Sequence, residues 1–551
     1  MRSLFPALLL TAVAAAPLAA QAPAGPASTP QFTAAGFRSH VAFLADDRLE
    51  GRDTGSRGHE IAAAYVASQF DGLGLKPGGE NGGWYQQVPF RKAVLGTAKP
   101  QVTIAGPGGS RTWESGTDVI VRASLLEEKQ DVTAPVVFVG YGIDAPRYGI
   151  ADYKGLDVKG KIVVVLAGTP RDLPSEIAAH YDDEKAATAA RYGAIGLVTV
   201  TTEEADQTRP WKDRLKYANS PAFTWVDKAG KPFDEAPAIR AGATLNVPAA
   251  EALFAGAAKP YAAVRKAAVP KGVHPKGFAL KTTIRIQRES VWSTITSPEV
   301  IGVLPGSDPA LKAEYVVLMG HLDHLGLKAD AKPGEDNIYN GALDNAAGVA
   351  TMLEVARAFA ASGKPPRRSM LFIANTAEER GLLGAEYFAH NATVPVKSIV
   401  GLVDLDMPLL LYPFTDVIAF GADHSTVAKV VAEAGAAIGV KLIADPMPEE
   451  GIFTRSDHYK FVQQGVPAVF LATGYGNGGD KVWKQFLSGN YHSLKDDMNQ
   501  PILWDEGAKF AKLNYLISRD MADSNARPLW YKGDFFGDLY APNAPKAEPG
   551  R

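Results

Sequence analysis

Four clusters of histidine, tyrosine and carboxylate residues carry the side chains of this sequence that are best suited to chemistry. They are His321 with Asp323, Glu378 with Glu379, Asp404 with Asp406, and Tyr491 with His492. Asp344 stands by itself between the first two clusters. The chain contains no cysteine, so any transition metal that it binds must be held by imidazole and carboxylate groups, which zinc accepts as ligands. The residue types therefore predict a metal site.

A site with two metal ions would use every one of these side-chain types. Two zinc ions about 3.5 to 4 Å apart need a carboxylate that bridges them, and together they lower the pKa of a shared water and polarise a carbonyl. A free carboxylate beside the water acts as a general base, and a further aspartate orients a histidine ligand. The sequence has a candidate for each of these tasks.

Each cluster taken alone also has an ordinary interpretation. Adjacent glutamates such as Glu378 and Glu379 usually lie at a solvated helix start, and an isolated His492 would more often be a loop histidine. The clusters nevertheless all follow predicted strands or lie in the loops beyond them. Open α/β sheets place their active sites at the carboxyl ends of the strands, so this shared position favours one common site.

Strands and helices alternate in the part of the chain that must position these residues. Strand patterns cover residues 300–304, 315–319, 369–375, 399–405, 417–420 and 468–472, and helical patterns cover 345–361, 381–390, 424–438 and 505–521. This alternation predicts an α/β fold with a mainly parallel, doubly wound sheet flanked by helices. Asp344 falls at the predicted start of a helix, and His321 follows a buried apolar strand.

Composition narrows the possible classes of function. Hydrophobic residues make up 46% and charged residues 21% of the 551 positions, which is ordinary for a globular protein, and the length predicts about three or four structural units. A formal net charge of −3, without a tract of Lys and Arg, argues against nucleic acid as a partner. The absence of cysteine excludes disulfides, thiol catalysis and cysteine zinc sites.

The first 22 residues, MRSLFPALLLTAVAAAPLAAQA, are typical of a secretory signal peptide. They contain one Arg, an apolar stretch from Leu4 to Ala16, and small residues around Ala20. A membrane anchor is the alternative, but the apolar stretch is short and Pro17 interrupts it. No later segment has the roughly 18 unbroken apolar residues of a spanning helix. We therefore expect a protein that is exported to the periplasm or the medium without stable membrane insertion.

Four further residues have predictions of their own. Arg52 and Asp53, in the turn-rich segment LEGRDTGSRG, are expected in a solvated loop between helices. His180 is expected at the surface because it has no partner at ligand spacing. His324 follows His321 by three residues and is expected to pack or to line the cleft.

Six motifs, in order, make the sequence similar to a known family. They are GHLDHLG, YNGALDNAAGVA, NTAEERGLLGA, DLDM, SDH and YHSLKD, between residues 321 and 496. This series resembles metallopeptidase family 28, the cocatalytic dizinc aminopeptidases, over roughly residues 290–525. The runs VGYGI, DVKGKIVVVLAGTP and ARYGAIGLVTVT resemble the protease-associated domain, a module inserted into several peptidases.

The resemblance implies zinc as the cofactor, with two ions per chain. His321, Asp344 and Asp406 would bind one ion. Glu379 and His492 would bind the other together with Asp344, which would bridge the pair. Many relatives carry two aspartates in the bridging motif where this chain has Leu343-Asp344, but the bridging position itself is retained.

The resemblance also implies three catalytic residues. Glu378 would be the general base and proton shuttle, Asp323 would orient His321, and Tyr491 would help to stabilise the oxyanion. Ser456-Asp457-His458 matches a family segment near the substrate, but a plain helix start explains it equally well. It is not a serine-hydrolase triad, because no G-x-S-x-G elbow accompanies it.

The expected function is an exported aminopeptidase that hydrolyses amino-terminal residues from peptides through a hydroxide between two zinc ions. Three alternatives stay open: a carboxypeptidase of the same fold, a glutaminyl cyclase of the same fold that uses one zinc, and an inert peptide-binding protein. Neither the residue preference nor the oligomeric state follows from the sequence.

The same comparison divides the chain into segments. We expect the signal peptide at 1–22, a helical first part of the peptidase domain at 31–95, and the protease-associated insert at 96–288. The zinc peptidase domain would continue over 289–530. The C-terminal tail, 531–551, is expected to end in disorder.

Overall fold

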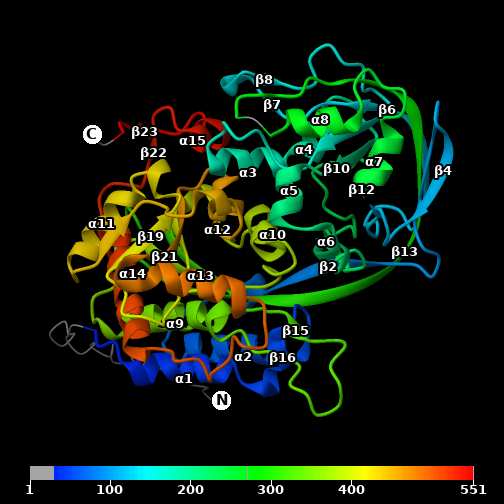
Figure 1. Cartoon of the computed structure of the whole chain (residues 1–551). Helices are drawn as coiled ribbons and strands as arrows, with labels where there is room; N and C mark the ends of the chain where they lie inside the picture. Colours follow the sequence, from blue (N-terminus) through cyan, green and yellow to red (C-terminus); the bar gives the residue numbers. More distant parts are fainter. Residues whose placement is uncertain (1–29, 270, 550–551) are drawn as a thin grey trace, which may run out of the picture.

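The structure is a computed structural model that describes residues 30–269 and 271–549 (Figure 1). The predicted signal peptide lies outside these residues. The two largest apolar cores among the described residues lie in the peptidase part of the chain and in the insert. None of the helices in the described residues is both long enough and apolar enough to cross a membrane.

Four parallel strands form the centre of the peptidase sheet. β14 (Tyr315–His321) lies between β17 (Ser369–Asn375) and β18 (Ile399–Asp404), and β21 (Ala468–Thr473) extends the sheet beyond β18. Nearly every side chain of these strands is buried. Burial on both faces explains why the strands appear in the sequence as unbroken apolar runs.

Antiparallel strands flank this parallel centre. On one side β19 (Asp416–Phe420) runs antiparallel to β21 and parallel to β20 (Lys441–Ile443). On the other side β13 (Phe278–Leu304) runs antiparallel to β17 and to β2 (Tyr85–Leu95). The predicted α/β fold with an inserted smaller domain is confirmed. The sheet is mixed at its edges, and the strands that lead to the candidate site are the parallel ones.

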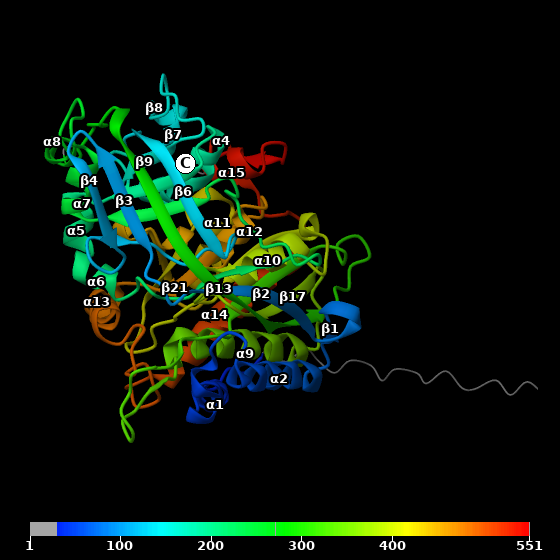
Figure 2. The same ribbon diagram turned by 90° about the vertical axis from the view of Figure 1, so that its right-hand side faces the viewer.

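Helices cover both faces of the peptidase sheet (Figure 2). One face carries α1 (Ala34–Leu44), α2 (Arg57–Gly72), α9 (Ala347–Ala361) and α14 (Trp504–Asp523). The other carries α10 (Leu383–Asn391) and α12 (His458–Val462). Helix α9 is almost entirely buried because it contacts β14 of the sheet as well as the helices α1 and α14. A helix in that position has little need of a polar face.

The insert has a sheet of its own. Its strands include β3 (Gln101–Gly106), β6 (Lys129–Phe138), β9 (Ile162–Leu166), β10 (Gly196–Val200) and β12 (Ala241–Leu245). The first part of β13 pairs with β3 and β6, and the second part pairs with β2 and β17. One strand therefore belongs to both sheets, and the predicted boundary between residues 288 and 289 falls inside it.

The C-terminal segment is ordered over its described residues, so the prediction that it ends in disorder is wrong up to residue 549. β22 (Trp530–Tyr531) pairs with β23 (Lys546–Ala547), and α15 (Phe535–Tyr540) lies between them in sequence. Trp530 and Phe536 are buried in the peptidase core. These two aromatic side chains bury enough apolar surface to hold a segment whose composition is otherwise typical of a flexible tail.

Candidate metal centre

The five predicted ligands meet at the carboxyl edge of the parallel strands. His321 is the last residue of β14, Asp406 lies two residues beyond β18, and Glu379 follows β17. Asp344 lies in the turn before α9, and His492 comes from the loop after α13 (Gly479–Gly489). Side chains far apart in sequence thus reach one place because parallel strands end at the same edge of the sheet.

The distances within the cluster fall into two sets joined by Asp344. His321 Nε2 lies 3.3 Å from Asp344 Oδ1 and 3.2 Å from Asp406 Oδ1. His492 Nε2 lies 3.2 Å from Asp344 Oδ2 and 3.2 Å from Glu379 Oε2. The two carboxylate oxygens of Asp344 therefore face two different histidines.

These four distances suit donor atoms that share a zinc ion. Ligand atoms about 2.0 to 2.1 Å from a tetrahedral zinc lie about 3.3 Å from one another. His321, Asp344 and Asp406 have ligand atoms close enough to hold one ion, and all three residues are buried. Imidazole and carboxylate are the correct donor types. The residues present therefore fit zinc, and Asp344 has the position of a bridge.

Electrostatics make the cluster attractive to positive charge. Burial alone lowers the pKa of His321, but the carboxylates of Asp406, Glu378 and Asp344 outweigh it and raise that pKa well above its ordinary value. Burial alone also lowers the pKa of His492, but hydrogen bonds to Asp344 and Glu379 outweigh it and raise that pKa to about 10. Both histidines hold protons tightly because carboxylates outnumber them, and the same negative charge would attract a metal ion.

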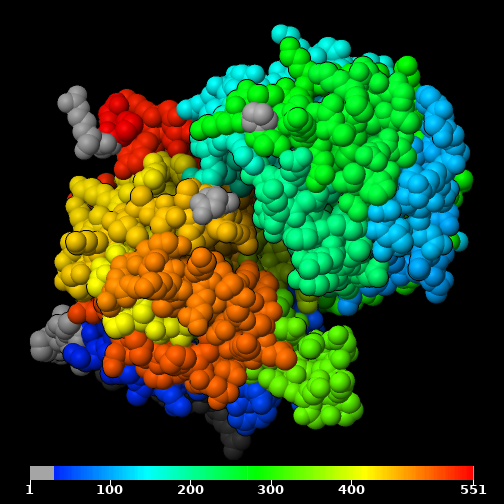
Figure 3. Space-filling view, viewed as in Figure 1, coloured from blue at the N-terminus to red at the C-terminus, as the bar shows by residue number. Residues whose placement is uncertain are grey.

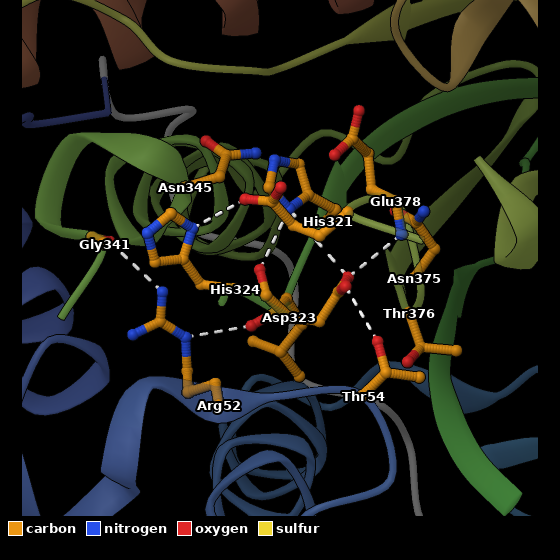
Figure 4. A network of polar contacts seen from close by, with 12 residues as sticks. Arg52, Thr54, His321, Asp323, His324, Gly341, Asn345, Asn375, Thr376 and Glu378 are labelled. Atoms are coloured by element: carbon orange, nitrogen blue, oxygen red, sulfur yellow. Dashed lines mark hydrogen bonds and ion pairs between the residues drawn. The ribbon is translucent and has the colours of Figure 1, made fainter. Parts of the chain in front are cut away.

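Asp323 contacts His321 through its main chain. His321 Nδ1 lies 3.0 Å from the Asp323 carbonyl oxygen, whereas the nearest carboxylate oxygen is 3.9 Å away. A proton on Nδ1 leaves Nε2 free as a ligand atom. The buried Asp323 carboxylate instead accepts from Thr54 Oγ1 at 3.0 Å and from the Glu378 main-chain N–H at 3.2 Å (Figure 4). It thereby joins three loops.

Glu378 and Tyr491 line a cavity of about 290 Å³ beside the cluster. Burial, with repulsion from Asp406, raises the pKa of Glu378 well above its ordinary value, although His321 opposes this. Burial and the nearby carboxylates also raise the pKa of Tyr491, so its phenol stays protonated at neutral pH. The remaining walls include apolar and charged side chains: Met407, Ile452, Trp483, Leu487, Glu450 and Arg455.

Arg52 connects two loops of the site, and the prediction that it lies in a solvated loop is wrong. The side chain is buried, with 1% of its surface exposed. Its guanidinium donates to the carbonyl oxygens of Leu322 at 2.9 Å, Asn340 at 2.7 Å and Gly341 at 3.1 Å, and also to that of Leu44. Most of these acceptors lie about half the chain away, so no local pattern reveals them.

Two further residues support the ligands. The Asp496 carboxylate accepts from the main-chain N–H groups of Leu343 at 3.0 Å and Asp344 at 2.9 Å. Ser456 Oγ lies 2.8 Å from Asp404 Oδ2 and 2.9 Å from Asp406 Oδ2. Asp496 follows the predicted ligand His492 by four residues in the motif YHSLKD, and that position is the signal that could have singled it out. Ser456, in the motif SDH, has no predicted ligand near it in sequence.

The insert lies against the site. His180 is buried, contrary to prediction, with Nδ1 2.9 Å from the Tyr459 hydroxyl. A second cavity, of about 480 Å³, lies between the insert and the metal cluster. Its lining includes Asp183, Glu184 and Glu235 from the insert together with Glu378, Glu379 and His492. Figure 3 shows the surface hollowed between the insert, in teal and green, and the orange segment that precedes His492.

Comparisons with known proteins agree with this geometry. Residues 299–517 match the model of Peptidase family M28, and residues 132–231 match the PA domain. The chain is 33% identical over 113 residues to a vacuolar membrane protease of Yarrowia lipolytica, and 33% identical over 108 residues to a probable zinc metalloprotease of Pyrenophora teres f. teres. Each match covers 20% of this chain but only 11% and 22% of those relatives.

A solved structure extends the likeness to nearly the whole chain. The aminopeptidase from Aneurinibacillus sp. strain AM-1 aligns over 95% of this chain and 98% of its own, with a TM-score of 0.51 and 19% identity. At that identity the match supports the fold, with the insert included. The motifs, the edge of the sheet on which they meet and the two matched domains lead to the same assignment. Residues 299–517 form a peptidase domain of family M28, and a PA domain is inserted into the peptidase part of the chain.

Proposed function

We propose that this protein is an exported zinc aminopeptidase with two ions per chain. The observation that carries the proposal is the arrangement around Asp344, whose two oxygens face His321 with Asp406 on one side and His492 with Glu379 on the other. A carboxylate shared in this way is what a pair of metal ions requires.

Glu378 is the proposed general base. When bound, the two zinc ions would polarise the scissile carbonyl and make a water between them more acidic. Glu378 lines the cavity together with Asp344 and Asp406, so its carboxylate is placed to take the proton of that water and to pass it to the leaving amine. The hydrogen bond from its main-chain N–H to Asp323 holds the loop in place.

Tyr491 is the proposed hydrogen-bond donor to the oxyanion. Its ring stacks on that of His492, with the centroids 3.8 Å apart, and its raised pKa keeps the hydroxyl proton in place. A neutral phenol in the cavity wall can stabilise negative charge on the former carbonyl oxygen. The apolar walls of the cavity suit the side chain of the substrate's amino-terminal residue. The acidic groups suit the free α-amino group of that residue.

Replacing Glu378 by Gln tests the general-base assignment. Because the carboxamide keeps the size but cannot accept a proton, turnover of aminoacyl reporters should fall by about 10²- to 10⁴-fold. Zinc content, measured by elemental analysis, should stay at the wild-type value because Glu378 is not a proposed ligand. Turnover within a few-fold of the wild type would contradict the assignment.

Substrate and metal measurements separate the alternatives. An aminopeptidase should cleave peptides with a free amino terminus and leave amino-acetylated peptides intact, whereas a carboxypeptidase should show the reverse dependence on the carboxyl terminus. One zinc per chain with cyclisation of amino-terminal glutamine would favour a glutaminyl cyclase. No turnover of any reporter by zinc-loaded protein would favour an inert peptide-binding protein.

A further inference from the structure

His324 lies deep in the site, where its ring has little freedom. The side chain has no exposed surface, and its main-chain N–H donates to the Arg52 carbonyl oxygen at 3.2 Å. Gly341 has a φ of +60°, and a side chain there would come within 2.7 Å of the His324 ring. Figure 4 shows the Arg52 guanidinium extending to Gly341 beside that ring. The ring is therefore held in one place by its surroundings.

One polar contact of the ring is short. His324 Nδ1 lies 2.7 Å from Glu379 Oε1, and an ionised carboxylate can only accept, so Nδ1 carries the proton. The other ring nitrogen, Nε2, is buried and has no hydrogen-bond partner among the described residues. The contact with Glu379 is thus the one hydrogen bond that this ring makes in the part of the chain that the structure describes.

The distances separate His324 from the proposed ligands. The four distances between proposed ligand atoms are 3.2 to 3.3 Å, close to the separation of about 3.3 Å expected around a tetrahedral zinc. His324 Nδ1 departs from this value in both directions, at 2.7 Å from Glu379 Oε1 and 3.9 Å from Asp344 Oδ2. The shorter distance is that of a charge-assisted hydrogen bond.

We propose that His324 is a positioning residue for the metal ligand Glu379. Its Nδ1–H binds Oε1 of Glu379 and so turns Oε2 toward His492 and the ion that these two residues and Asp344 would share. The proposal rests on the proposed function for the identity of the metal site. It replaces the expectation that His324 merely packs or lines the cleft.

A direct ligand role for His324 is the competing explanation, because His324, Asp344 and Glu379 also have potential ligand atoms close enough to share an ion. His324→Asn distinguishes the two roles. The asparagine Nδ2 stands close to the place of histidine Nδ1 and can donate to Glu379, but an amide nitrogen does not bind zinc. His324→Ala removes both abilities.

The experiment measures zinc release from the purified, zinc-loaded full chain to a colorimetric chelator, with elemental analysis for stoichiometry. We expect His324→Ala to hold one of its two ions about 10- to 100-fold more weakly, as losing a hydrogen bond to a metal ligand usually does, and His324→Asn to recover most of that loss. The other ion, held by His321, Asp344 and Asp406, should keep its affinity. His390→Ala, which changes an exposed histidine, should keep both.

Other outcomes would overturn the proposal. Equal weakening by Asn and Ala would make His324 a ligand, and unchanged zinc affinity in His324→Ala would deny it any role. If the alanine variant does not fold by circular dichroism, His324→Gln takes its place, because its amide lies one atom too far out to reach Oε1 in the same way. The experiment measures zinc binding, so a lack of peptidase activity alone would not contradict the role of His324. A wild-type chain that binds fewer than two zinc ions would contradict both that role and the proposed function.

Discussion

At the scale of single residues, the carboxylates of the site outnumber the hydrogen-bond donors beside them. Ser456 shows this most clearly, because two aspartates compete for its hydroxyl. Its hydroxyl has one proton but lies within hydrogen-bond distance of Asp404 and Asp406 at the same time. It can donate to only one of them at any moment. Both carboxylates are buried, and burial raises the pKa of Asp406. The Ser456 hydroxyl therefore reduces the repulsion between two buried carboxylates.

Ser456→Ala should lower the free energy of unfolding by about 1 to 3 kcal/mol, because it removes a donor from buried Asp406 Oδ2, whereas Asp404 Oδ2 keeps the His458 main-chain N–H at 3.1 Å. Urea unfolding of the metal-free protein measures this. Ser488→Ala is the matched control, since that hydroxyl is exposed and bonds only to main-chain carbonyls of its own helix, and it should change the value by less than about 0.5 kcal/mol. Equal effects of the two substitutions would refute the role of Ser456.

Residue types and their order were enough to single out the candidate ligands, because metal chemistry restricts which side chains can serve. His321, Asp344 and Glu379 do lie together, while their individual roles stay predictions. The partners Arg52 and Ser456 were not predicted. Their hydrogen bonds cross from about 50 to almost 290 positions of sequence, and nothing in the local pattern encodes such a contact.

At the scale of elements, strands buried on both faces were predicted most closely. The pattern at 369–375 coincides with β17, while the pattern at 315–319 stopped two residues short of His321, which still pairs with β17. Short elements were missed. β20 has three residues, and α13 begins in a glycine-rich turn without a side chain that caps it. β20 is too short to show periodicity, and α13 lacks the start signal on which a helix prediction depends.

Arg52 connects the first loop after α1 to the two loops that carry His321 and Asp344. Arg52→Ala should lower the free energy of unfolding by about 3 to 5 kcal/mol, because several buried carbonyl groups lose their donor at once. Zinc retention should fall as well, since the loops that carry His321 and Asp344 lose a common anchor. Chemical denaturation and elemental analysis measure the two effects.

Arg48→Ala provides the control for this element. Arg48 lies in the same short helical segment, but its side chain is 86% exposed and pairs only with Asp46. Exposed ion pairs contribute little to stability, so this variant should unfold within about 0.5 kcal/mol of the wild type. A loss for Arg52→Ala no larger than that for Arg48→Ala would show that the buried guanidinium does not anchor the loops.

At the scale of the whole molecule, His424 joins three distant segments. Its Nε2 lies 2.8 Å from Glu176 of the insert, and its Nδ1 lies 2.6 Å from Asp534 near the C-terminus. Burial alone lowers the pKa of His424, but the hydrogen bonds to these two carboxylates outweigh it and raise the pKa from 6.5 to about 9. The charged imidazole therefore binds the insert and the C-terminal segment to the peptidase domain.

Stability should depend on pH through this residue. A folded-state pKa above the unfolded value contributes stability that is complete below pH 6.5 and is lost as the pH rises through about 9. The shift corresponds to about 3 kcal/mol at most. The difference in unfolding free energy between the wild type and His424→Gln should therefore be large at pH 6 and small at pH 9.5. A constant difference for His424→Gln would exclude the link.

Export belongs to the same scale and stays a prediction, because the first 22 residues lie outside the part of the chain that the structure describes. The position of the insert was predictable from its motifs, since glycine-closed apolar runs mark separate β structure. Its limits were not, because β13 continues through the predicted boundary without a turn or a change in composition that would mark it.

The shared strand β13 makes the insert and the peptidase domain parts of one cooperative unit. A hinge needs a segment whose backbone is free to rotate, and at this junction the backbone is hydrogen bonded to β6 on one side of the predicted boundary and to β2 on the other. Opening one sheet would pull on the hydrogen bonds of the other. Scanning calorimetry should therefore record a single heat-absorption peak, with calorimetric and van't Hoff enthalpies that agree, and two separate peaks would show that the two halves of β13 melt independently.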